Sequence, residues 1–261
     1  AGSEALRFVV RQRGQVFPDV PVVYVSVSDA DLRRMEPLPP EYVGVPLRHD
    51  FVGTIEQALQ WRPKARHLLI VLDTTEFGRE FEERLRSESR AFAGRRDIEF
   101  MIVDSIAALQ SRLQGLGDDW LVFTPGFFVD RQGGRTVPRE AAQLMASASP
   151  VPVLGPYPTF MGTGVLGGRM VSFSQMGKAA ALISADLISG IPIESLAPPE
   201  SVPLPLEVDW RQTQRFGISD AQFPPGTIVK FKTPTFWQQY RDLALAGVAV
   251  MLVQFILIGA L

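Results

Sequence analysis

The sequence predicts an α/β protein with two lobes, in which parallel strands are covered by helices on both faces. Short continuous runs of apolar and β-branched residues alternate with amphipathic helical patterns through the middle of the chain, and this alternation is typical of strands buried on both sides. A hydrophobic content of 46% in 261 residues is enough to bury a substantial core. The 21 prolines and 22 glycines predict many turns between short elements.

One strand is predicted near the start of the chain and four more between residues 67 and 154. The first, Val20–Val27, is far from the others in the sequence, so we assign it to a different lobe. The other four are continuous apolar runs, which favour buried parallel strands. They are His67–Leu72, Ile98–Val103, Trp120–Thr124 and Val151–Leu154.

Helices are predicted around these strands from the spacing of apolar residues. Phe77, Phe81 and Leu85 recur every four residues, as one face of a helix requires. Pro138 favours the start of a helix, and Gly190 favours the end of one. The predicted helices are 51–61, Glu76–Phe92, Ile106–Leu116, Arg139–Ala148 and Met176–Ile188.

Two segments rich in proline are expected to cross between the lobes. Met35–Asp50 precedes the helix at 51–61, and a second Pro-rich stretch follows Gly190. After that stretch we expect three short elements: a strand at Leu206–Val208, a helix at Trp210–Phe216 and an edge strand at Thr227–Phe231.

The end of the chain predicts a membrane helix. Residues 243–261 are apolar apart from Gln254, and about 19 residues rising about 1.5 Å each match the hydrocarbon core of a bilayer. Trp237, Tyr240 and Arg241 favour the interface beside it. A core helix that is apolar on all sides is the alternative. The chain stops inside the apolar run and starts without Met or a signal peptide, so we expect residues to be missing at both ends.

Composition and motifs argue against several classes of function. A net charge of −2 without a basic stripe gives no support to nucleic-acid binding, and the absence of cysteine rules out thiol chemistry and disulfides. His49 and His67 are isolated, so structural or surface roles are expected for both. Residues 162–168 contain a G-x-G-x-x-G match, but Pro156 and Pro158 intervene after the strand, so a close turn at a cleft or hinge is expected there. We expect no catalytic residue, metal or cofactor.

A small polar or aromatic organic ligand is expected at the carboxyl ends of the strands, where open parallel sheets bind ligands. The candidate residues supply hydroxyls, backbone amides and aromatic rings in the loops after the strands. They are Ser26, Ser28, Asp73, Thr74, Thr75, Phe77, Thr124, Gly126, Phe127, Tyr157 and Phe160. For the Asp, Ser and Thr residues, helix N-capping is the alternative role. For Phe127, Tyr157 and Phe160, core or lobe-interface packing competes with ligand stacking.

Several stretches in this order resemble a known family. They are Val20–Asp29, Leu38–Val45, Lys64–Val71, Gly167–Phe173, Gly177–Ala180, Ile188–Gly190, Val208–Gln212, Phe216–Ile218 and Pro224–Gly226. Together they resemble the ABC-transporter substrate-binding-protein family of the type I periplasmic-binding fold. Phe236–Arg241, which leads directly into the apolar run, is similar to the form found as the extracytoplasmic sensor of bacterial sensor histidine kinases.

The resemblance implies two Rossmann-like lobes with parallel sheets that close on a ligand across a hinge. Its first lobe normally begins with a strand, a helix and a strand that would precede residue 1, so the first lobe is expected to be incomplete. The implied boundaries are 1–50 for part of the first lobe, 51–190 for the second α/β lobe, 191–231 for the return crossing and the rest of the first lobe, 232–242 for a juxtamembrane linker and 243–261 for a transmembrane helix.

The resemblance also implies a function. We expect the extracytoplasmic small-molecule-sensing domain of a membrane-bound, homodimeric two-component sensor histidine kinase, with its soluble part on the periplasmic side of the inner membrane. Ligand-induced lobe closure would carry the signal, and the kinase would follow residue 261, so this segment itself is expected to be non-catalytic.

Two other functions are weighed against sensing. The first alternative is a membrane-tethered substrate-binding component of an ABC transporter, although such proteins usually hang from an N-terminal lipid on cysteine, and this chain has none. A hydrolase or oxidoreductase is disfavoured because the necessary constellations of residues are missing.

Overall fold

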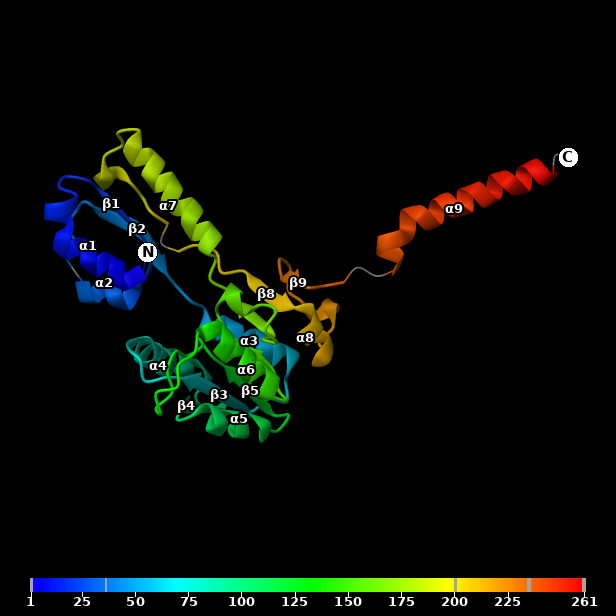
Figure 1. Cartoon of the computed structure of the whole chain (residues 1–261), viewed down its shortest axis with the longest axis horizontal. Coiled ribbons are helices and arrows are strands. Elements are labelled where there is room, and N and C mark those ends of the chain that lie inside the picture. Colours follow the sequence, from blue (N-terminus) through cyan, green and yellow to red (C-terminus); the bar gives the residue numbers. More distant parts are fainter. Residues whose placement is uncertain (1, 36, 200, 234–235, 260–261) are drawn as a thin grey trace. The chain divides into compact units, whose positions relative to one another are not determined.

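The computed structural model describes residues 2–35, 37–199, 201–233 and 236–259. The chain divides into two compact units, Ala1–Lys230 and Phe231–Leu261. The first unit contains the sheets and all but one of the described helices, as Figure 1 shows.

A mainly parallel sheet forms the larger lobe of the first unit. Within the described residues it has seven strands in the order β4-β3-β5-β6-β7-β8-β9, and every neighbouring pair is parallel except β7 and β8. The strands are β3 His67–Leu72, β4 Asp97–Ile102, β5 Trp120–Phe123, β6 Val153–Leu154, β7 Gly167–Arg169, β8 Leu206–Asp209 and β9 Ile228–Lys230. The predicted α/β fold with a mainly parallel sheet is thus confirmed.

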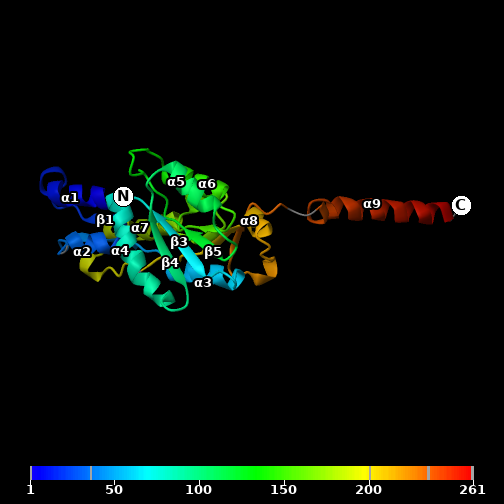
Figure 2. The ribbon, with the colours of Figure 1, turned by 90° about the horizontal axis from the view of Figure 1, so that it is seen from below.

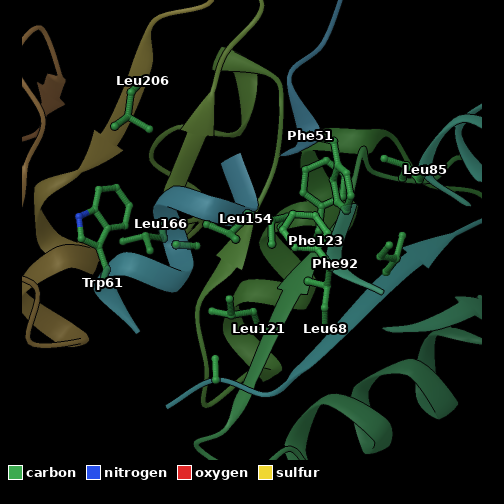
Figure 3. Packing of buried hydrophobic residues seen from close by; sticks show 14 of the residues in the cluster. Phe51, Trp61, Leu68, Leu85, Phe92, Leu121, Phe123, Leu154, Leu166 and Leu206 are labelled. Carbon is green, nitrogen blue, oxygen red and sulfur yellow. The ribbon is translucent and has the colours of Figure 1, made fainter. Parts of the chain in front are cut away.

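Strand β3 lies between two apolar cores because successive strand residues point to opposite faces. Leu68, Ile70 and Leu72 belong to one core, whereas Leu69 and Val71 belong to the other. Figure 3 shows the first core, where Phe51, Phe92 and Phe123 gather beside Leu68. The continuous apolar run of β3 is therefore the consequence of burial on both faces.

Helices cover both faces of this sheet. The helix α3 supplies Phe51 and Ile55 to the first core, and α5 and α6 supply Leu109 and Met145 to the second. Figure 2 shows α5 and α6 on one side of β3 and β5, with α3 on the other. The helices of this lobe are α3 Phe51–Trp61, α4 Glu76–Glu88, α5 Ile106–Gln114, α6 Pro138–Ala148 and α8 Trp210–Arg215, with short 3-10 turns η1 Ser89–Phe92, η2 Pro158–Phe160 and η4 Asp220–Gln222.

A smaller lobe is built on two parallel strands, β1 Val22–Ser28 and β2 Tyr42–Leu47. The helices α1 Gly2–Val16, α2 Asp29–Met35 and α7 Phe173–Ile188 pack around it. Met176 and Ile183 of α7 share an apolar cluster with Val43 and Val45 of β2. The strand β2 lies in the segment for which the sequence predicts only a crossing, because its short apolar alternation is masked by the neighbouring prolines and glycine.

The return segment 191–231 was expected to complete the first lobe. After the short 3-10 turn η3 Ile193–Ser195, the structure instead adds β8 and β9 to the larger sheet. Val208 is fully buried there, and the Asp209 backbone N–H donates to the Leu166 carbonyl at 2.9 Å. Burial against the larger core thus determines where these strands pair.

The second unit contains α9, Phe236–Gly259, within the segment predicted to form a transmembrane helix. The expected membrane span is not found: in the described parts of the chain, no helix combines the length and apolar character that crossing a membrane requires. Residues 260 and 261 of the predicted span lie outside the described residues.

Truncating Phe51 should unfold the larger lobe more easily. Phe51 is 1% exposed, and its ring lies 4.9 Å from that of Phe123 and 6.1 Å from that of Phe92. We expect Phe51→Ala to lower the free energy of unfolding by about 3–5 kcal/mol, measured by urea denaturation. The matched control Phe173→Ala, at a half-exposed position, should cost much less. Equal losses in the two variants would contradict this account of the core.

Candidate functional site: a cavity between the two lobes

A cavity of about 850 Å³ lies between the smaller and larger lobes of the first unit. The smaller lobe contributes the carboxyl ends of β1 and β2 and part of α2, and the larger lobe contributes α4 and the loop before η2. Both views of the ribbon place α4 beside α2. The cavity therefore lies at the strand ends, where parallel sheets bind ligands.

One face of α4 forms the wall contributed by the larger lobe. Phe77, Glu80, Phe81, Arg84 and Glu88 all line the cavity. They are spaced by three or four residues, so they share one face of the helix. This face combines two aromatic rings with a cation and two carboxylates.

His49, just after β2, joins the two lobes through side-chain contacts. Its Nε2 lies 3.1 Å from the Tyr157 hydroxyl, and its Nδ1 lies 3.0 Å from Nη1 of Arg84. Its ring also meets Phe81 and Tyr157 edge-on, with centroids 5.1 and 5.4 Å apart. Residues from two other parts of the chain, α4 and the loop at Tyr157, thus converge on one imidazole.

The environment of His49 keeps it neutral. Burial lowers the pKa of His49 well below its ordinary value of 6.5, and the Arg84 guanidinium lowers that pKa further. Burial also raises the pKa of the Tyr157 hydroxyl, so this phenol stays protonated. For Arg84 and Glu88, burial lowers the pKa of the guanidinium and raises that of the carboxyl, and their mutual attraction opposes both changes.

Ion pairs connect the lobes at the edge of the cavity. Arg34 of α2 pairs with Glu80 of α4, and Arg7 of α1 lies 3.6 Å from Glu76 of α4. Asp31 accepts from Arg7 and Ser28, and these partners together with Ser3 and Arg34 lower the pKa of its carboxyl despite burial. These pairs hold the smaller lobe against α4.

Four of the candidate residues line the cavity: Ser26, Ser28, Phe77 and Tyr157. Ser26 has a positive φ of 61°, at the irregularity where the register of β1 shifts between Val25 and Val27. Ser28 donates to Asp31 at 3.2 Å and also accepts from the Asp31 backbone N–H. The remaining candidates do not line the cavity.

The candidates after β3 are occupied in holding loops together. Asp73 is 1% exposed and accepts from the Phe128 backbone N–H at 2.7 Å and from the Thr75 backbone N–H at 3.1 Å. Thr75 caps α4 by accepting from Gly78. Thr74 is exposed. Helix N-capping, the alternative role predicted from the sequence, is the role of Thr75, whereas Asp73 holds the loop before the helix.

The candidates after β5 are buried in the larger lobe. Thr124 donates to the Val71 carbonyl and accepts from Gly126. Gly126 has a φ of 83°, and a Cβ there would come within 2.5 Å of Pro138. Phe127 and Phe160 are fully buried in the second core. Packing, the alternative role for these two aromatics, is what the structure shows.

Sequence reasoning missed His49, Phe81 and Arg84 as cavity residues. The helical spacing of Phe77, Phe81 and Arg84 was a usable signal, because it places a cation beside two aromatic rings on one face of the helix. The contact between His49 and Tyr157 had no such signal, since they are 108 residues apart.

The glycine-rich segment 162–168 serves packing. Gly167 of β7 lies opposite Val208 of β8, and a Cβ on Gly167 would come within 2.1 Å of the Glu207 carbonyl oxygen. Its φ of 144° also disfavours a side chain. The close approach of two strands explains this glycine.

Comparisons with known proteins identify solved structures with a similar fold. No family model matches the chain, and no curated protein does. A ligand-free, open substrate-binding protein with adhesive properties from Clostridium difficile is similar in structure, with a TM-score of 0.67, 12% identity, and coverage of 89% of this chain and 77% of that chain. A conserved domain protein from Vibrio cholerae has a TM-score of 0.62 and 17% identity, covering 88% and 76%.

A third solved structure is the ABC domain from Streptococcus pneumonia in complex with L-Trp. It has a TM-score of 0.57 and 14% identity, and the match covers 87% of this chain and 76% of that chain. These likenesses, at low identity, show the fold: a two-lobed α/β architecture of the substrate-binding-protein type.

The neutral state of His49 should make stability depend on pH. Below its ordinary pKa of 6.5, the unfolded chain binds a proton that folded His49 does not take up, so unfolding is favoured as pH falls. The contribution of neutral His49 to the free energy of unfolding is therefore fully present above pH 6.5. It is lost as the pH falls from 6.5 toward the lowered pKa that His49 has in the folded state. We expect a loss of up to about 1.4 kcal/mol per pH unit in this window.

Urea denaturation of the original chain and of His49→Gln at pH 7.5 and 5.5 measures this dependence. The difference between the two proteins should change with pH, whereas His67→Gln should keep the His49 contribution. If the free energy of unfolding changed equally with pH in the original chain and in His49→Gln, His49 would not be held neutral.

Proposed function

We propose that this chain binds a small organic molecule in the cavity between its lobes. The cavity volume of about 850 Å³ supports this, since small-molecule sites usually occupy about 300–1,000 Å³. Its lining mixes aromatic rings with a few charged groups, as such sites do. The observation that carries the proposal is the position of this cavity at the strand ends of a two-lobed, substrate-binding-protein-like fold.

Binding is proposed to act by closing or holding the lobes together. A ligand in the cavity meets β1, α2 and β2 on one side and α4 on the other, so it adds contacts to both lobes at once. Such contacts shift an open–closed equilibrium only as far as they favour the closed state. Tyr157 supports this coupling, because it packs against the apolar clusters of both lobes.

Two biological settings are proposed for this binding. In the first, the chain is the extracytoplasmic sensor of a membrane-bound histidine kinase that acts as a homodimer, and the resemblance of Phe236–Arg241 to such sensors supports it. In the second, it is the substrate-binding component of an ABC transporter, which the likeness to a substrate-binding protein supports equally. Both settings place the first unit outside the cytoplasm.

The coding sequence beyond residue 261 separates the two settings. Sensing predicts that a kinase region follows, and a stop codon within a few residues would contradict it. Delivery to a transporter predicts genes for a permease and an ATPase beside this one, and their absence would count against that setting.

A thermal-shift screen tests the proposed binding itself. Amino acids, aromatic acids and sugars are added to the chain, and we expect one class to raise the melting temperature by about 5 °C or more at one hundred times its Kd. Ala30→Trp, which places a large ring in the cavity lining, should abolish the shift. The control Ala107→Trp, at an exposed position of α5, should keep it.

Two results would contradict ligand binding in the cavity. The first is that no class of compound raises the melting temperature. The second is that Ala30→Trp leaves the shift intact, because the compound would then bind elsewhere.

A further inference from the structure

The hydrogen-bond chain through His49 has a fixed direction. Arginine only donates hydrogen bonds, so the contact of Arg84 Nη1 with His49 Nδ1 requires an unprotonated Nδ1. Neutral His49 then carries its proton on Nε2 and donates it to the Tyr157 oxygen. The hydroxyl proton of Tyr157 must therefore point away from His49.

Arg84 has donors left over beside the cavity. Its Nε and Nη2 are buried and make no hydrogen bond to the described residues, although Nε lies 3.3 Å from Glu88 Oε1. Buried donors without an acceptor are costly, and most such groups in folded proteins find a partner. The side chain as a whole is 31% exposed and lines the cavity, so a ligand that engages these two buried donors must first rotate the guanidinium.

The acidic groups that the smaller lobe brings to the cavity, and Glu80 of α4, have cationic partners other than Arg84. Asp31 and Glu80 pair with Arg34, and Asp29 pairs with Arg48 at 3.1 Å. The carboxylates of the smaller lobe therefore neither occupy the leftover donors of Arg84 nor add an unbalanced negative charge beside it. At Arg84 and Tyr157 the cavity offers donors that make no hydrogen bond to the described residues, with the Glu88 carboxylate as the one charge paired with Arg84.

An apolar surface lies next to these donors. Leu47 and Phe77 line the cavity with the rings of Phe81 and Tyr157. The ring centroids of Phe77 and Phe81 are 4.8 Å apart. This surface accepts a hydrocarbon or aromatic body, whose burial is favourable.

We propose that the cavity selects small organic carboxylates with an apolar or aromatic body. The carboxylate accepts from Arg84 and from the Tyr157 hydroxyl, and the body packs on Phe77, Phe81 and Leu47. His49 is a positioning residue, which orients Arg84 and Tyr157 without touching the ligand. This inference rests on the proposed function and names the ligand class of the same site.

Matched acid and amide probes test the proposal. L-tryptophan, L-phenylalanine, L-leucine and indole-3-propionate are compared with their carboxamides by calorimetry on the chain. At least one acid should bind about 10- to 100-fold more tightly than its amide, because charge-assisted hydrogen bonds are lost in the amide. Indole-3-propionate has no amine, so it reports on the carboxylate alone.

Variants assign that preference to the residues. Arg84→Met should remove the acid-over-amide preference, Arg84→Lys should keep part of it, and Tyr157→Phe should reduce it. The matched control Arg79→Met changes an exposed arginine of the same helix that does not line the cavity, so it should leave the preference unchanged.

A nitrogen NMR measurement tests the orientation of His49 without any ligand. The Nε2–H tautomer is expected in the original chain, and Arg84→Met should release Nδ1 and shift its signal. A merely structural histidine would give the same tautomer in both proteins.

Several outcomes would overturn the proposal. Equal binding of acids and amides, an acid preference that survives Arg84→Met, or an Nδ1–H tautomer in the original chain would each do so. If sugars or amines bind in the cavity and the acids do not, the carboxylate inference fails while ligand binding stands. If no compound of any class binds, the proposed function itself fails.

Discussion

The burial of β3 on both faces is the constraint on which the rest of the molecule depends. Its residues alternate between two apolar cores, so helices must cover both sides of the sheet. Asp73 directly follows the strand. Its carboxylate ties the loop after β3 to Phe128, and Thr75 then caps the start of α4. These contacts fix where α4 begins, and its face carrying Phe77, Phe81 and Arg84 lies at the cavity.

The contact between the lobes combines apolar packing with two hydrogen bonds in series, in which Arg84 donates to His49 and His49 donates to Tyr157. Tyr157 touches the apolar clusters of both lobes, and His49 connects its hydroxyl to Arg84. Polar groups in such surroundings are costly unless they are satisfied, and here part of Arg84 is not. An incompletely satisfied cation beside a cavity is what a binding site for an acceptor requires, whereas a purely structural network would close on itself.

Polar residues at strand ends proved to have two different roles. Those after β3 and β5 hold their own loops, because buried backbone N–H groups there need acceptors. Ser26, at the register shift of β1, and Ser28, at the end of that strand, line the cavity instead. Residue type alone does not separate these roles, since a serine or aspartate suits both a cap and a ligand.

The sequence by itself determined four strands of the larger lobe, β3 to β6, and the apolar faces of the helices beside them, because burial leaves a recognisable pattern of apolar residues. Four candidate site residues were found from the same local logic. Tertiary structure alone decided that α7 packs on β1 and β2 and that β8 and β9 extend the larger sheet. It also brought His49 to Arg84 and Tyr157, which are 35 and 108 residues away in the sequence. The physical reason is that a local pattern records which face of an element is buried, but not which distant surface buries it.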